Sequence, residues 1–193
     1  MNKIFEKFKI SNNSPVIVTF TLLCFASYIL SQIFGYKFNH TFFSVYRSSL
    51  ANPLTYLRFF THVLGHASRS HLIGNITLLL VVGPLLEEKY GSKNILMIIL
   101  VTAFMTGLVN YMFFPYRSLL GASGVVFAFI LLSPFTNLKS GYIPITLILV
   151  VIFYIGGQIF DGLFVKSNVS NLSHIIGGAV GAVSGFILQK AHN

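Results

Sequence analysis

The chain has 193 residues, of which 54% are hydrophobic and only 9% charged, and its mean hydropathy is +0.78. Soluble domains carry roughly 25% charged residues, so this composition excludes an ordinary soluble globule and predicts several spans of about 20 residues. The formal net charge is +9. Because the basic residues are scattered between apolar runs, they favour lipid headgroups over nucleic acid as partners.

The single cysteine, Cys24, lies inside an apolar run and has no partner for an internal disulfide. It is expected to be a small packing residue. No Cys/His cluster has the spacing of a metal site, so neither a metal nor another cofactor is expected.

Residues 15–34 form the first predicted span. Ser14 is its expected N-cap and Pro15 its first residue. A signal peptide is the rival interpretation, but the apolar run is too long and no clear cleavage site follows it. The preceding segment, residues 1–14, is expected to be short and cytoplasmic because it holds a basic cluster: Lys3, Lys7 and Lys9.

Residues 35–70 are amphipathic and too polar to span a membrane, yet long for a simple loop. We expect short helices lying in the membrane interface. Two histidines of this segment, His62 and His66, could hydrate a cavity, but are expected to be polar interfacial residues.

Five further spans are predicted, at residues 71–86, 93–114, 122–135, 142–160 and 171–189. The span at residues 71–86 should end at the charged turn Glu87-Glu88-Lys89, with Glu88 bonded to Ser92 or Asn94. Ser92 is the expected N-cap of the span at residues 93–114. The chain is therefore predicted to be one all-α membrane domain, residues 1–193, with six transmembrane helices.

With a cytoplasmic N-terminus, the predicted helices that begin near residues 71, 122 and 171 all start on the outer side. Their first turns hold the most unusual polar groups of the spans: His71 with Asn75, then Ser123, then His174. His71 and Asn75 are four residues apart and so share a helix face. Three separate segments thereby bring polar side chains to one layer.

Ser123 lies in the stretch Gly121-Ala122-Ser123-Gly124, at the start of an apolar run. Glycine allows a tight turn there, and the first turn of a helix favours an oxyanion. Taken alone, the pattern is more typical of close helix packing. The short helix of about 14 residues covers roughly 21 Å of a hydrocarbon core of about 30 Å, so Ser123 should lie below the outer surface, where a polar group must be paired or hydrated.

His174 is followed by Gly177, Gly181 and Gly185, at spacings of three, seven and eleven residues. This stripe lets a neighbouring helix approach the face that carries His174. If that neighbour is the helix that begins at Ala122, His174 meets Ser123.

The chain has only four acidic residues: Glu6, Glu87, Glu88 and Asp161. The glutamates fall on the predicted cytoplasmic side, and Asp161 is expected to be solvated in a loop. A Ser-His-Asp triad therefore lacks a third member, and the residues favour a Ser-His dyad.

With these motifs in order, the chain resembles the rhomboid family of intramembrane serine proteases, in its short, six-helix bacterial GlpG type. The resemblance begins near Pro15 and covers nearly the whole chain. The stretches that carry it are Gly121-Ala122-Ser123-Gly124, His71-x-x-x-Asn75, His174-x-x-Gly177-x-x-x-Gly181, Arg58-Phe59-Phe60-Thr61-His62 and Glu88-Lys89-x-Gly91-Ser92.

The resemblance implies that Ser123 is the nucleophile and that His174 is the general base and then acid. His71, Asn75 and the backbone N–H of Ser123 would form the oxyanion site. Four further positions would support the site or the substrate: Gly121, Phe127, Gly177 and Gly181. The implied substrates are transmembrane proteins. The implied location is the bacterial inner membrane, with the site open to the outer, periplasmic side.

The chain departs from the family pattern at two positions. Leu57-Arg58 stands where the family often has Trp-Arg, and Phe127 stands where a tyrosine often stacks under the histidine. A phenyl ring can still stack, but it lacks the hydroxyl.

Two other functions are compatible with a membrane protein of this kind. One is a catalytically inactive rhomboid-like protein that binds membrane clients, which the presence of Ser123 and His174 argues against. The other is a small transporter or channel. It predicts polar residues along a full crossing, yet the inner halves of the helices that would hold the site are almost purely apolar.

Overall fold

The computed structural model describes residues 13–137, 145–157 and 168–190. Four of its helices are long and apolar enough to cross a membrane: α1 (Pro15–Phe34), α4 (Arg69–Tyr90), α5 (Ser92–Phe113) and α9 (Asn168–Lys190). A fifth apolar helix, α6 (Ser123–Leu132), is shorter. The predicted all-α membrane architecture is confirmed for the described part of the chain.

The long segment between the first two spans folds into short helices, as its composition predicts. They are α2 (Tyr36–Phe43), α3 (Pro53–Thr61) and the 3₁₀ turn η1 (His62–Leu64). Arg58 ties the segment together from a buried position. Its Nε donates to the carbonyl of Thr41 at 2.7 Å, and its guanidinium lies 4.4 Å from the centre of the Tyr46 ring. The arginine of the predicted Leu57-Arg58 pair therefore holds this segment folded.

Helix α4 is longer than predicted, because it continues through Glu87-Glu88-Lys89 to Tyr90. Gly91 then turns the chain with a φ of 82°, a value that favours glycine. Helix α5 starts at the next residue, and the hydroxyl of Ser92 caps no backbone group there. The charged run belongs to the helix, and the predicted cap at Ser92 is wrong.

The carboxylate of Glu87 holds three helix ends together. It accepts hydrogen bonds from the N–H groups of Val16 and Ile17, at 3.0 and 2.9 Å, and from the hydroxyl of Ser92 at 2.6 Å. Ser14 and Pro15 occupy the predicted N-cap and first position of α1, although the Ser14 side chain makes no capping hydrogen bond. The prediction for Ser92 is corrected, since the acid bonded to it is Glu87 and not Glu88. A buried acid from another helix supplies the cap, as the free N–H groups of a first turn require.

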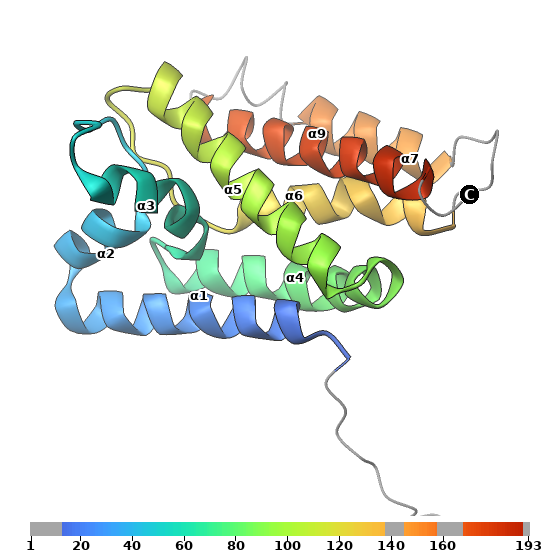
Figure 1. The fold of residues 1–193 in the computed structure, drawn as a ribbon, viewed down its shortest axis with the longest axis horizontal. Helices are drawn as coiled ribbons and strands as arrows, with labels where there is room; N and C mark the ends of the chain where they lie inside the picture. The colour runs from blue at the N-terminus through green and yellow to red at the C-terminus, as the bar shows by residue number, and fades with distance from the viewer. Residues whose placement is uncertain (1–12, 138–144, 158–167, 191–193) are drawn as a thin grey trace, which may run out of the picture.

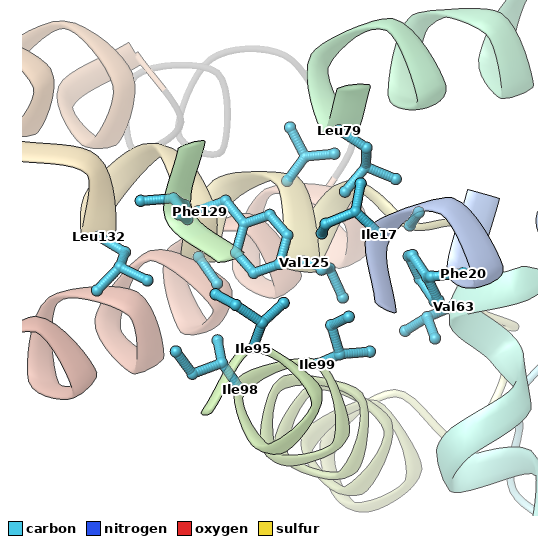
Figure 2. Packing of buried hydrophobic residues seen from close by; sticks show 14 of the residues in the cluster. Ile17, Phe20, Val63, Leu79, Ile95, Ile98, Ile99, Val125, Phe129 and Leu132 are labelled. Atoms are coloured by element: carbon cyan, nitrogen blue, oxygen red, sulfur yellow. The ribbon is translucent and has the colours of Figure 1, made fainter. Parts of the chain in front are cut away.

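Helix α6 lies at the centre of the bundle, in contact with α4, α5 and α9 (Figure 1). Its Val125 and Phe129 are fully buried. Figure 2 shows them surrounded by side chains of α1, α4 and α5, among them Ile17, Leu79 and Ile99. A helix that is apolar on every face and enclosed by its neighbours needs no polar side.

Glycines on α9 bring that helix against α6, as their spacing predicts. A Cβ on Gly177 would overlap the carbonyl of Gly124, and a Cβ on Gly181 would overlap the carbonyl of Ala128. One turn later, a Cβ on Gly185 would meet the ring of Phe135 at 2.5 Å. Backbone packs on backbone along this line, which fixes the spacing and rotation of α9.

After Leu132 the chain tightens into a 3₁₀ segment, η2 (Ser133–Asn137), so the α-helix predicted to reach Phe135 ends three residues early. Part of the predicted span at residues 142–160 is described, as α7 (Ile145–Val150) and a π-helical turn η3 (Val151–Ile155). Residues 142–144 and 158–160 of that span, together with Glu6 and Asp161, lie outside the described residues.

Candidate active site

The hydroxyl of Ser123 faces the imidazole of His174, with Oγ and Nε2 2.9 Å apart. Ser123 is the first residue of α6, and His174 lies in the N-terminal part of α9, directly before the glycine stripe. The ring of Phe127, one turn after Ser123, stacks on the imidazole with centroids 4.3 Å apart and planes 7° from parallel. Phenylalanine therefore makes the stacking contact expected of it, and the serine and histidine meet in hydrogen-bonding geometry.

Gly121 is forced to be glycine by its backbone and by its neighbour. Its φ is 128°, and a Cβ there would lie 2.7 Å from Cε1 and Nε2 of His71. Its N–H donates to the carbonyl of His62 at 2.9 Å. The turn before Ser123 is therefore pressed against the His71 ring and anchored to the interfacial segment.

A second link joins the same two segments two residues earlier. Val45 and Leu119 exchange a pair of backbone hydrogen bonds, each 2.9 Å long, and both residues are buried. The amide of Asn110, on α5, donates to the carbonyl of Val45 at 3.0 Å. The residues just before α6 are thus tied to the interfacial segment by hydrogen bonds. Such support is what a functional site next to a loop requires.

His66 orients the amide of Asn75. Its Nδ1 lies 3.1 Å from the carbonyl of Leu64, so Nδ1 must donate, and its Nε2 then accepts from the Asn75 amide nitrogen at 3.1 Å. The amide nitrogen carries two hydrogens, so one stays available for another acceptor. The rings of His66 and His71 meet edge to face, with centroids 5.0 Å apart. His71 lies against the turn at Gly121, and Ser123, two residues later, faces His174, so residues of all three predicted segments lie in one region.

His62 and His66 are buried, with about 1% of each side chain exposed, so their interpretation as interfacial polar residues is wrong. Burial lowers the pKa of His66 to about 4, helped by the neighbouring His71 and opposed by the Leu64 carbonyl. Burial also lowers the pKa of His62 to about 4, although the carbonyls of Arg58 and Phe59 oppose it. Both imidazoles are therefore neutral at pH 7 and can each accept one hydrogen bond.

The imidazole of His62 bridges the interfacial segment and α5. Its Nδ1 lies 3.0 Å from the Arg58 carbonyl and must donate, and its Nε2 lies 3.2 Å from the Thr106 hydroxyl, whose hydrogen also has the Thr102 carbonyl within reach at 2.7 Å. Gly107 provides the room, because a Cβ there would press on the His62 ring at 3.2 Å. The side chain of His62 thus contacts α5, while its backbone carbonyl accepts a hydrogen bond from the N–H of Gly121.

No described carboxylate lies near the serine and histidine. Glu87 and Glu88 are in the last turn of α4, about 24 Å along the helix from His71. Among the described residues no group of three His, Cys, Asp or Glu side chains could hold a metal ion. The polar groups that the described residues bring together here are a hydroxyl, imidazoles, an amide and backbone N–H groups.

Sequence reasoning missed His66 as part of this cluster. The sequence held one signal for it. Asn75 and His66 are polar residues on either side of His71, and a buried amide needs partners for its N–H donors. Their pairing depends on how the chain turns between η1 and α4, which neither residue's spacing reveals.

Comparison with known proteins identifies the family. The Rhomboid domain family matches residues 53–191. The chain is 26% identical over 190 residues to the rhomboid protease GlpG of Haemophilus influenzae, covering 94% of each chain. It is 30% identical over 158 residues to rhomboid-related protein 2 of Mus musculus, covering 71% of this chain and 52% of the mouse protein. The chain, an all-helical membrane protein with its serine and histidine on neighbouring helices, belongs to the rhomboid family.

Proposed function

We propose that this chain is an intramembrane serine endopeptidase that cleaves peptide bonds in or next to transmembrane segments by a Ser-His dyad. The 2.9 Å contact between Ser123 Oγ and His174 Nε2 carries the proposal. This distance is within the range for a serine activated by an adjacent base. The similarity to a rhomboid protease across 94% of both chains supports the same class of reaction.

In the proposed mechanism, Nε2 of His174 accepts the proton of the Ser123 hydroxyl as Oγ attacks the scissile carbonyl carbon. The imidazolium then gives that proton to the leaving amine, which departs with the C-terminal product. A water molecule then gives a proton to the same nitrogen as its oxygen attacks the acyl-serine ester. The imidazolium returns that proton to Oγ as the ester bond breaks, which releases the N-terminal product as a carboxylic acid. Phe127 holds the imidazole plane through both steps, because its ring lies flat on that of His174.

The proposed oxyanion site comprises the Ser123 backbone N–H, the Asn75 amide and the imidazole of His71. The N–H of Ser123 is in the first turn of α6, where it has no helical partner. The Asn75 amide keeps one hydrogen free after bonding to His66. Removal of one such donor typically slows turnover by a factor of roughly 10²–10³, and sharing between side chains reduces this loss.

We place the protein in the inner membrane of a bacterium, as a multi-pass protein with a cytoplasmic N-terminus and the site open to the outer side. The basic cluster Lys3, Lys7 and Lys9 supports this orientation. In this orientation α4, α6 and α9 all begin on the outer side. The proposed partners are transmembrane substrates and the bilayer itself, with no metal, cofactor or nucleic acid.

The test is cleavage of a model transmembrane substrate by the purified chain in liposomes. Ser123→Ala and His174→Ala should each abolish cleavage, and the double variant should be no worse than either single variant. Melting curves of the variants should stay close to that of the wild type, which separates lost chemistry from lost fold. Substantial cleavage by Ser123→Ala would refute the serine mechanism.

The alternative is a catalytically inactive rhomboid-like protein that binds membrane clients. It predicts that the wild type retains a transmembrane client without cleaving it and that Ser123→Ala retains it equally well. The same liposome assay, read by co-purification of intact client, distinguishes this outcome from proteolysis.

A further inference from the structure

An apolar groove of about 640 Å³ runs between α5 and α9. Its walls include Met97, Val101 and Met105 of α5 and Ile176, Val180 and Val183 of α9. Met97 and Val183 are each more than half exposed, so the groove opens to the surroundings of the helices. The glycine stripe of α9 packs on α6, so the groove occupies another side of α9.

The length of the groove matches one leaflet of a bilayer. It begins at Asn94, near the start of α5, and reaches Met105, halfway along that helix. Eleven residues of helix cover about 17 Å, and half of a hydrocarbon core is about 15 Å. Beyond Met105 the helices close, because the space lined by Thr106, Ser173 and Ile176 has no room for a water molecule.

The walls of the groove suit a hydrocarbon chain. They are apolar apart from Asn94 and Ser184. An acyl chain fits such walls because it requires no hydrogen bonds from them.

The charge at the open end selects the headgroup. Lys93 is exposed and lies one turn before Met97, on the groove side of α5. Lys89 is exposed in the last turn of α4, four residues before Lys93 in the chain, while the acid Glu87 is buried and hydrogen-bonded to Val16, Ile17 and Ser92. One exposed acid, Glu88, precedes Lys89 in α4, so the two lysines and this acid together carry a net charge of +1. Each lysine or arginine near an anionic lipid surface strengthens the binding of the protein to that lipid.

We propose that this groove binds an anionic phospholipid, with one acyl chain along the α5–α9 walls and the phosphate beside Lys93. The lipid comes from the leaflet in which α5 begins. It packs α9, the helix that carries His174, on a side that no described helix covers over this length.

The test uses the full chain in phosphatidylcholine liposomes that contain a small fraction of phosphatidylglycerol with a photoactivatable diazirine in its acyl chain. After irradiation, peptide mass spectrometry should find adducts concentrated on Met97, Val101, Val180 and Val183. The membrane-exposed residues Leu22 and Ile29 of α1 report on bulk lipid. Equal labelling of α1 and the groove would overturn the proposal.

Two variants test the walls and the charge separately. Ala179→Phe places a ring in the groove, since Ala179 is exposed and lines it, and should reduce groove labelling to the level of Leu22. Ala26→Phe is the matched control on an exposed position of α1 and should leave groove labelling unchanged. Lys93→Gln should reduce labelling by phosphatidylglycerol about fivefold, whereas Lys37→Gln, in α2, should not.

Two comparisons test which headgroup the groove prefers and whether its occupant is a lipid. In the wild type, a diazirine phosphatidylcholine should label the groove less than the phosphatidylglycerol probe does; equal labelling would refute selection by charge. Cross-linking of the groove residues to a second copy of the chain, without lipid adducts, would show a protein interface there and overturn the lipid site. Melting temperatures of all four variants, measured in detergent, confirm that each one folds.

Discussion

The ring of Phe127 lies flat against the imidazole of His174, with centroids 4.3 Å apart and planes 7° from parallel. Residues one turn apart on α6 thus contact the same histidine, since Ser123 meets Nε2 while Phe127 covers the face of the ring. The stack requires a flat side chain and makes no use of a hydroxyl. The position therefore accepts phenylalanine in a family where tyrosine is often found.

Phe127→Leu should lower kcat about two- to twelvefold with little change in KM, because an aromatic pair contributes about 0.5–1.5 kcal/mol beyond its burial. Phe127→Tyr keeps the ring and should retain most activity. Cleavage kinetics on a transmembrane substrate give both values. If Phe127→Leu matched the wild-type kcat, the stack would have no part in positioning His174.

Gly121→Ala should nearly abolish activity. The new Cβ would need both a φ of 128° and space that His71 occupies, so either the turn before Ser123 or the imidazole must move. A misplacement of about 1 Å can cost roughly 10²-fold in rate. The measurement is kcat/KM beside a melting curve.

The matched control for that change is Gly74→Ala. Gly74 lies between His71 and Asn75 on α4, and a Cβ there meets no atom within 4 Å. Alanine should stabilise the helix by up to about 1 kcal/mol and leave cleavage intact. Comparable losses in Gly121→Ala and Gly74→Ala would mean that the close approach of Gly121 to His71 does not matter.

Gly181→Ala should lower both stability and activity although glycine does no chemistry. Its Cβ would overlap the carbonyl of Ala128, so α9 must move away from α6 and take His174 with it. Melting temperature and cleavage rate should fall together, in contrast to Ser123→Ala, which should lose only the rate. A fully stable and active Gly181→Ala would disprove the packing of α9 on α6 through this line of glycines.

Glu87→Ala should destabilise the protein by about 3–5 kcal/mol without changing the chemistry of the site. Two N–H groups of α1 and the Ser92 hydroxyl lose their buried acceptor, and each unsatisfied buried donor costs about 1–3 kcal/mol. Urea or thermal unfolding in mild detergent measures the loss, and cleavage at low temperature should persist. The neighbouring exposed acid gives the control, since Glu88→Ala should change stability by less than about 0.5 kcal/mol.

Stability should fall as the pH drops from about 7.5 to 5, through His62. Its pKa is about 4 in the folded protein and 6.5 in the unfolded chain, so below pH 6.5 protons bind the unfolded state first and favour it. Over that range the loss is on the order of 2 kcal/mol, and below pH 4 it levels off. His66 adds to it in the same direction.

Melting temperatures across that pH range provide the check. His62→Gln should melt lower at pH 7.5 but lose less on acidification, because the group that takes up the proton is absent. An equal acid sensitivity in His62→Gln and the wild type would exclude this histidine as the cause.

The sequence by itself determined the spans and most of the candidate site. Apolar runs of about 20 residues have little alternative in a membrane but to form helices that satisfy their own backbone, so α1, α4, α5 and α9 could be predicted. The spacing of Gly177, Gly181 and Gly185 after His174 is a property of one helix. It predicted which face of α9 would approach a neighbour, and the choice of α6 followed from Ser123.

Only the tertiary structure decided the contacts made by isolated polar residues. Glu87 caps a helix some 70 residues away, and His66 bonds to Asn75 across a turn. Neither pairing leaves a periodic signal, because each depends on where two elements meet and not on the spacing within either one. The same reason explains the error on His62 and His66: a segment that reads as amphipathic folds on itself, and burial changes a polar loop histidine into a neutral hydrogen-bonding group of the core.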